Sequence, residues 1–176
     1  MRRTVRLLGI MVCSGAVLAQ AGPVEDAAAA ILRKDYASAT RLLRPLAEAG
    51  DARAQWRLGE MAYYGLGQPE DDQVALGWFD KAARQGLAEA QLRLGHMYAY
   101  GHVQLEPDAD PGRLAAQWYF EAARQGLAEA QYSLGVLFLT GTGVQRDHAE
   151  ALVWMQRAAA QGHADAAVYV QAKRAR

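Results

Sequence analysis

The chain has 176 residues, a formal net charge of zero, 52% hydrophobic residues and 22% charged residues. This length and balance favour one folded domain with its own core and argue against an intrinsically disordered chain. Alanine accounts for 37 residues, and because alanine has the highest helix propensity, the composition predicts an all-helical protein. The sequence has no basic block, which argues against nucleic-acid binding, where clustered positive charge faces phosphates.

Residues 1–21 have the pattern of an export signal. Arginines precede an apolar stretch from Leu7 to Ala19, and Ala19 and Ala21 fit the small-x-small cleavage pattern. We therefore expect cleavage before Gly22 and a mature chain that is periplasmic or secreted. The apolar stretch is too short to span a bilayer, so we do not expect stable membrane insertion after cleavage. Cleavage also removes Cys13, the single cysteine, so a disulfide or thiolate chemistry is not expected in the mature chain.

The main feature of the sequence is an internal repeat. Residues 50–85, 86–125 and 126–161 share one pattern, and the longer middle unit places its extra residues in a loop around positions 101–112. A partial repeat is predicted upstream at residues 22–49, with its first helix near Val24–Arg33. Residues 162–176 are predicted to form a capping helix at the other end.

Each unit is predicted to form two antiparallel helices. In the first helix, Ala90, Leu94 and Tyr98 recur at intervals of four, which places them on one apolar stripe. We expect Asp71 and Asp147 to cap the second helices. Glycines interrupt the chain within and between hairpins, where a positive φ allows a tight turn: Gly65, Gly67, Gly86, Gly126, Gly141, Gly143 and Gly162.

Each full unit also combines a glycine inside its first helix with a tryptophan in its second. Because glycine costs about 1 kcal/mol relative to alanine in a helix interior, its recurrence indicates a close helix–helix contact. We expect the tryptophans to belong to the core and to fill the wedge between hairpins, so that Trp118→Ala should cost about 3–5 kcal/mol. These positions are Gly59, Gly95 and Gly135, and Trp78, Trp118 and Trp154.

The pattern resembles the Sel1-like repeat family, a relative of the tetratricopeptide repeat. The resemblance rests on the motifs A-x-x-x-LG-x-x-[YF]-x-x-G, G-x-G, D-x-x-x-A-x-x-W and AA-x-x-G at this spacing, and it covers roughly Ala28 to Ala172. It implies a right-handed α/α solenoid whose concave face binds proteins. Many bacterial members are exported and serve as adaptors or regulators in the cell envelope.

The sequence gives no clear sign of catalysis, metal binding or a cofactor. Its histidines, His96, His102, His148 and His163, have no metal-ligand spacing and are expected to be solvated or at helix ends. The acidic loop from Glu106 to Asp110 lacks the glycine and distal glutamate of an EF-hand, so we expect it to be solvated. We therefore predict that the protein is not an enzyme, with no catalytic, cofactor-binding or metal-binding residues.

Binding specificity is expected at positions that vary between repeats. On each first helix, residues spaced i, i+4, i+7 and i+11 share the face beside the apolar stripe. Since the first helices line the concave surface in solenoids of this type, these residues should form one strip that contacts a protein or peptide. The strip comprises Arg53, Arg57, Glu60, Tyr64, Glu89, Arg93, His96, Tyr100, Glu129, Ser133, Val136 and Thr140.

The residues and the resemblance together favour an exported interaction scaffold or adaptor of the bacterial envelope. A second hypothesis is a periplasmic immunity or inhibitor protein that neutralises a toxin. A third, β-lactam binding or hydrolysis, is disfavoured because the mature chain has no cysteine and no nucleophile–base pair. The sequence leaves the partner's identity and the oligomeric state open.

Overall fold

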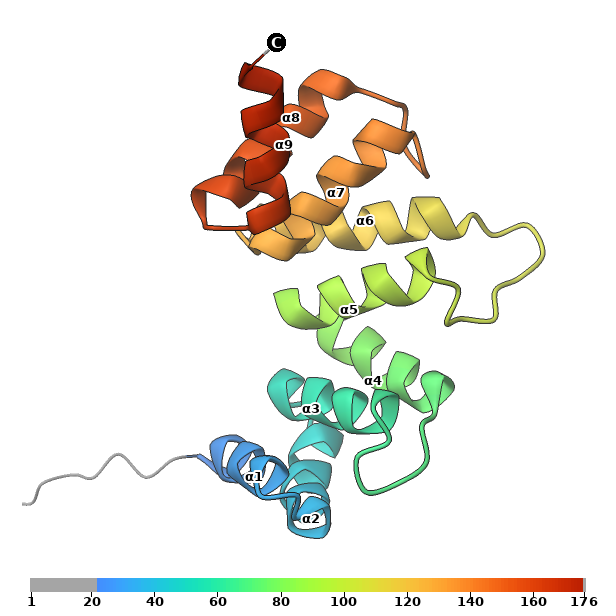
Figure 1. Ribbon diagram of the computed structural model, residues 1–176. Coiled ribbons are helices and arrows are strands. Elements are labelled where there is room, and N and C mark those ends of the chain that lie inside the picture. Colours follow the sequence, from blue (N-terminus) through green and yellow to red (C-terminus); the bar gives the residue numbers. More distant parts are fainter. Residues whose placement is uncertain (1–21, 176) are drawn as a thin grey trace, which may run out of the picture.

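A computed structural model describes residues 22–175 and shows nine α-helices and no strand in that range. The predicted signal peptide, with Cys13, lies outside the described residues. The all-α solenoid is confirmed (Figure 1). The helices are α1 (Pro23–Leu32), α2 (Tyr36–Glu48), α3 (Ala52–Tyr63), α4 (Asp72–Arg84), α5 (Ala88–Ala99), α6 (Pro111–Arg124), α7 (Ala128–Thr140), α8 (His148–Ala160) and α9 (Ala164–Arg174).

Successive helices pair as antiparallel hairpins that stack in chain order. Each helix packs chiefly on its neighbours in sequence, with α1 and α9 at opposite ends of the stack (Figure 1). The loops that join α3 to α4, α5 to α6 and α7 to α8 all lie on the same side, at the right in Figure 1. The middle of these is enlarged, as the longer second repeat predicts. The first helices of the four hairpins are α1, α3, α5 and α7.

The predicted helix ends are confirmed. Asp71 accepts a hydrogen bond from the backbone N–H of Val74 at 2.9 Å, and Asp147 accepts one from Ala149 at 2.8 Å. Every glycine predicted to turn the chain has a positive φ, as at Gly86, where φ is 91°. Side chains with a Cβ are strained there, so Gly86, Gly126 and Gly162 permit the sharp turn into the next repeat, and the other glycines permit turns within a hairpin.

The core differs from the prediction at the tryptophans. Trp154 is buried, but Trp78 and Trp118 are only half-buried against the cluster of the preceding hairpin. The residue that follows each tryptophan is the one packed on the glycine of the first helix. A Cβ at position 59 would lie 2.6 Å from the ring of Phe79, and one at position 95 would overlap the ring of Tyr119.

In the last full repeat, Met155 takes the same position over Gly135. The prediction of a glycine-enabled close contact is therefore right, and the large residue in that contact is the one after the tryptophan, which the sequence pattern did not identify. A helix rotates by about 100° per residue, so neighbouring residues point in clearly different directions. The position after the tryptophan faces the first helix of its own hairpin, while the tryptophan faces the hairpin before it.

A ladder of glutamines, which the sequence analysis did not single out, joins the repeats. Gln91 is 5% exposed; its side-chain amide donates to the carbonyl of Ala83 at 3.1 Å and accepts from Gln125 at 2.8 Å. Gln55 and Gln131 repeat this arrangement. Each buried amide links the end of one second helix to the following hairpin, which fixes the angle between units.

Substituting Gln91 with alanine should lower the free energy of unfolding by about 1–3 kcal/mol, because the Ala83 carbonyl and the Gln125 amide then lose a buried partner. Urea denaturation monitored by circular dichroism measures this. Gln117→Ala, on an exposed position of α6, is the matched control and should leave the unfolding midpoint unchanged. An equal shift in both variants would contradict the structural role of the ladder.

Candidate binding surface on the first helices

The twelve predicted positions lie on or directly after three first helices. Arg53, Arg57, Glu60 and Tyr64 belong to α3 and its C-cap; the other sets occupy the same places on α5 and α7. All twelve are exposed or half-buried, and Tyr100, at 73% exposure, is the most open of the tyrosines among them. We call these twelve residues the first-helix surface. That the surface binds a partner stays a prediction.

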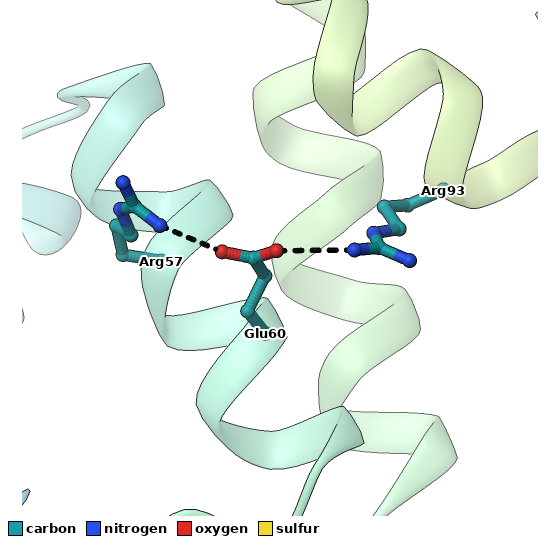
Figure 2. A network of polar contacts seen from close by, with 3 residues as sticks. All are labelled: Arg57, Glu60 and Arg93. Carbon is teal, nitrogen blue, oxygen red and sulfur yellow. Dashed lines mark hydrogen bonds and ion pairs between the residues drawn. The ribbon is translucent and has the colours of Figure 1, made fainter. Parts of the chain in front are cut away.

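An ion-pair network crosses from the first full repeat to the second (Figure 2). The two carboxylate oxygens of Glu60 accept from two guanidinium groups, Arg57 at 3.0 Å on the same helix and Arg93 at 3.3 Å on α5. The glutamate is 15% exposed, whereas the arginine side chains are 30% and 31% exposed. The carboxylate thus lies between two more open cations.

Aromatic rings hold both arginines in place. The guanidinium carbon of Arg57 lies 4.3 Å from the ring centre of Trp56, and that of Arg93 lies 5.5 Å from Tyr64. Both distances allow a cation–π interaction, which restricts the side chains without engaging their N–H groups. The network therefore holds two guanidinium groups in place, each of which makes one hydrogen bond to a protein acceptor within residues 22–175. The helical spacing in the sequence predicted that these charged residues and Tyr64 share one face, but it did not predict their mutual contacts.

A pocket of about 390 Å³ lies further along the surface, between α5, α6 and α7. It contains four of the predicted positions, Tyr100, Ser133, Val136 and Thr140. Sequence analysis missed the rest of its lining, which comes from inside the hairpin and from the enlarged loop's end: Tyr98, Ala99, Pro111, Gly112, Ala115, Tyr119, Tyr132, Leu137 and Thr142. Aromatic and aliphatic walls with hydroxyl groups are suited to an apolar side chain carrying one polar atom.

His96 was expected to be solvated or at a helix end, and it lies in the last turn of α5. It lies half-buried within α5, with its ring centre 5.5 Å from Tyr119 and 5.8 Å from Tyr100. Burial lowers the pKa of His96, and the positive charge of Arg93 lowers it further, while Glu129 acts in the opposite direction. The neutral imidazole is thus favoured beside the pocket.

The lowered pKa of His96 predicts a loss of stability in acid. Below the usual histidine pKa near 6.5, the unfolded chain binds a proton that the folded chain resists, so stability falls as pH falls from that value until the folded pKa is passed. Replacing His96 with glutamine should reduce the drop in thermal midpoint between about pH 7.5 and 5.5. His148→Gln, at an exposed position in α8, is the control; a drop that is unchanged in H96Q would contradict this assignment.

The two ends of the first-helix surface are tied to the neighbouring units. Arg53 pairs with Glu25 of α1 at 2.6 Å, and Glu129 lies 3.1 Å from the Nε2 atom of His163, whose ring stacks on Tyr132 at 4.3 Å. His163 is the N-cap of α9, as expected of a helix-end histidine. Side-chain contacts therefore link first helices from α1 to α3, from α3 to α5, and from α7 to α9.

Candidate metal-binding residues do not gather within residues 22–175, where no group of three or more His, Cys, Asp or Glu side chains could hold an ion. In the acidic loop, Asp110 accepts a hydrogen bond from the backbone N–H of Arg113 at 3.1 Å and caps α6. One of its carboxylates therefore has a structural role rather than the purely solvated one expected.

Stacked antiparallel hairpins with a shared surface of first helices define an α/α solenoid repeat protein. The family model described as Sel1 repeat matches residues 52–87, 88–127 and 128–163, so the chain belongs to the Sel1 repeat family. These matches begin two residues after each predicted unit. A search of curated protein sequences gives no significant match.

Solved structures agree with this assignment. A Sel1 repeat protein from Oxalobacter formigenes is 32% identical with a TM-score of 0.67, over 76% of this chain and 38% of that one. This chain thus spans less than half of that relative. Cysteine-rich protein B of Helicobacter pylori is 22% identical with a TM-score of 0.55, over 83% and 96% of the two chains, and supports the fold alone.

Sel1 repeat proteins generally serve as protein–protein interaction scaffolds, and their fold is typically non-catalytic. In the part of the chain from residue 22 to 175, none of the helices combines the length and apolar character needed to cross a membrane. The family thus supplies the general role of protein binding.

Proposed function

We propose that this protein is an exported scaffold of the bacterial cell envelope that binds a protein or peptide segment across its first-helix surface. Protein binding follows from the family role, and the export signal predicted in residues 1–21 supports the envelope location. Binding on the first-helix surface is the finer part of the proposal.

The observation that carries this proposal is the continuity of the surface. Arg93 reaches across the repeat boundary to Glu60, and the pocket beside Tyr100 is built from two adjacent repeats. An extended partner lying across the hairpins would therefore meet donors and an apolar pocket in succession. Exposed tyrosines, Tyr64 and Tyr100, supply rigid contact area of the kind enriched at interfaces.

Affinity capture from an envelope extract of the source organism tests the binding surface. The purified chain should retain a partner that is lost with the triple variant Arg57→Gln, Arg93→Gln, Tyr100→Ala. A matched triple variant on exposed positions of the second helices is the control: Gln117→Ala, Arg124→Gln and Val153→Ala. Loss of the partner in the control as well, or in neither variant, would reject the first-helix surface as the binding site.

Export is tested separately by cell fractionation and N-terminal sequencing. The chain should appear in the periplasm or medium with a new N-terminus at Gly22. A chain that keeps its first 21 residues and stays in the cytoplasm would refute the envelope part of the proposal, while leaving the binding surface open to the capture experiment.

A further inference from the structure

The basic side chains at the repeat boundary exceed their protein partners. Arg57 and Arg93 share one carboxylate, that of Glu60, which leaves a surplus of one positive charge at a half-buried position. Glu89, one turn before Arg93 on α5, makes no ion pair with it. Because half-buried charges are screened less than exposed ones, the surplus favours a second anion there.

The free donors of these arginines are available to that anion. A guanidinium group carries five N–H donors, and within residues 22–175 each of the two arginines makes one hydrogen bond to a protein acceptor. The rings of Trp56 and Tyr64 hold the planes in place. Ordered guanidinium forks match the geometry of a carboxylate, which can accept two parallel N–H bonds.

The chemistry of the partner follows from this site and the neighbouring pocket. We infer that the bound segment carries a carboxylate that pairs with Arg57 and Arg93, and a bulky apolar side chain that enters the pocket between α5, α6 and α7. This inference rests on the proposed function, whose partner it specifies. The pocket volume of about 390 Å³ and its walls, including Tyr119 and Val136, accommodate one aromatic or branched aliphatic side chain.

The spacing of the two groups in the partner follows from helix geometry. Arg93 and Tyr100 lie seven residues apart on α5 and its C-cap, which is about 10 Å at a rise of 1.5 Å per residue, and an extended chain advances about 3.3 Å per residue. Arg93 belongs to the arginine pair and Tyr100 lines the pocket, so the two partner side chains should be about three to four residues apart. An extended segment such as acidic-x-x-apolar meets this requirement.

Charge favours a single carboxylate over a polyanion. The chain from residue 22 onward has 16 basic and 19 acidic side chains, three arginines fewer than the full sequence. On the same surface, Arg53 is paired with Glu25, and Glu129 with His163. The surplus is therefore local, which suits one acidic residue of a peptide and not a nucleic acid, whose affinity needs many phosphate contacts.

A displayed library of random 12-residue peptides, selected on the purified chain, tests the inference directly. The expected consensus is an acidic residue followed or preceded, three to four positions away, by a bulky apolar residue. The leading peptide is then synthesised with a fluorescent label, and its Kd is measured by anisotropy. Enrichment of peptides without an acidic residue, or no enrichment at all, would overturn the inference.

A double-mutant cycle locates the carboxylate. Changing the peptide's acidic residue to its amide should weaken binding about 10-fold with the wild-type chain and less than about twofold with Arg57→Gln, Arg93→Gln. Arg124→Gln is the matched control, since it removes an exposed arginine of the second helix α6 that pairs with Glu121 and lies outside the first-helix surface, and it should behave as wild type. An acid dependence that persists in the double variant would refute the site.

The pocket is tested with Thr140→Trp, which fills its mouth from an exposed position at the end of α7. Peptide binding should fall about 10-fold while the circular dichroism spectrum stays unchanged; full binding by this folded variant would exclude the pocket. Competition between the natural partner and the selected peptide distinguishes the proposed function from the inferred partner chemistry. If it is captured through the first-helix surface but is not displaced by the selected peptide, the proposed function stands and the inferred partner chemistry fails.

Discussion

Replacing Tyr119 with alanine should lower the free energy of unfolding by about 3–5 kcal/mol, and replacing the adjacent Trp118 should cost clearly less. Tyr119 is 2% exposed and packs on Gly95, where no other side chain can fill the space that its ring leaves. Trp118 is half-buried at the edge of the cluster of the preceding hairpin, so its removal exposes surface without opening a closed cavity.

Guanidinium denaturation of both variants under the same conditions checks this order. Tyr119→Phe is the conservative control: it keeps the ring over the glycine and should retain most of the stability. A larger loss of unfolding free energy for Trp118→Ala than for Tyr119→Ala would mean that Trp118 contributes more to the core than Tyr119, and it would contradict the packing of Tyr119 on Gly95.

Most of the fold could be predicted because repetition makes each signal appear several times. A single glycine before a single helix is weak evidence, but Gly86, Gly126 and Gly162 mark the same turn in three successive copies, and all have a positive φ. The same holds for the caps at Asp71 and Asp147. Repetition could not show whether Trp118 or Tyr119 packs on the glycine of the first helix, because both positions hold a large residue in each full repeat.

The candidate surface was predicted less completely because side-chain partners depend on distance across repeats. The helical spacing placed Arg57, Glu60 and Tyr64 on one face of α3, but only the stacking angle brings Arg93 of the next repeat to Glu60. The pocket is similar, since Tyr119 and Pro111 reach it from a second helix that spacing within the first helix does not describe. The half-burial of His96 was not predicted for the same reason, because its ring packs against Tyr119 of the second helix of its hairpin.

The second large effect is expected at Gly95, where alanine should destabilise the protein by about 1–3 kcal/mol in spite of its better helix propensity. A Cβ at this position would overlap two ring carbons of Tyr119, whose side chain is buried between α5 and α6. Relief would require the ring to leave its packed position or the two helices to separate, and separation would disturb the hydrogen bonds that Gln91 makes with Ala83 and Gln125.

Alanine substitutions at two other helical glycines separate the steric effect of an added Cβ from the gain in helix propensity. Gly77 lies on the exposed face of α4, where an added Cβ would meet nothing within 4 Å, so Gly77→Ala should stabilise by about 0.5–1 kcal/mol. At Gly135 the added Cβ would lie 3.1 Å from side-chain atoms of Met155, a flexible thioether that can shift, and 3.3 Å from the carbonyl oxygen of Ala151, so alanine there should fall between the other two variants in stability. The unfolding midpoints should therefore rank G77A above G135A and G135A above G95A. A gain in stability for Gly95→Ala like that of Gly77→Ala would show that α5 and α6 are not held at the distance on which the packing of the whole array depends.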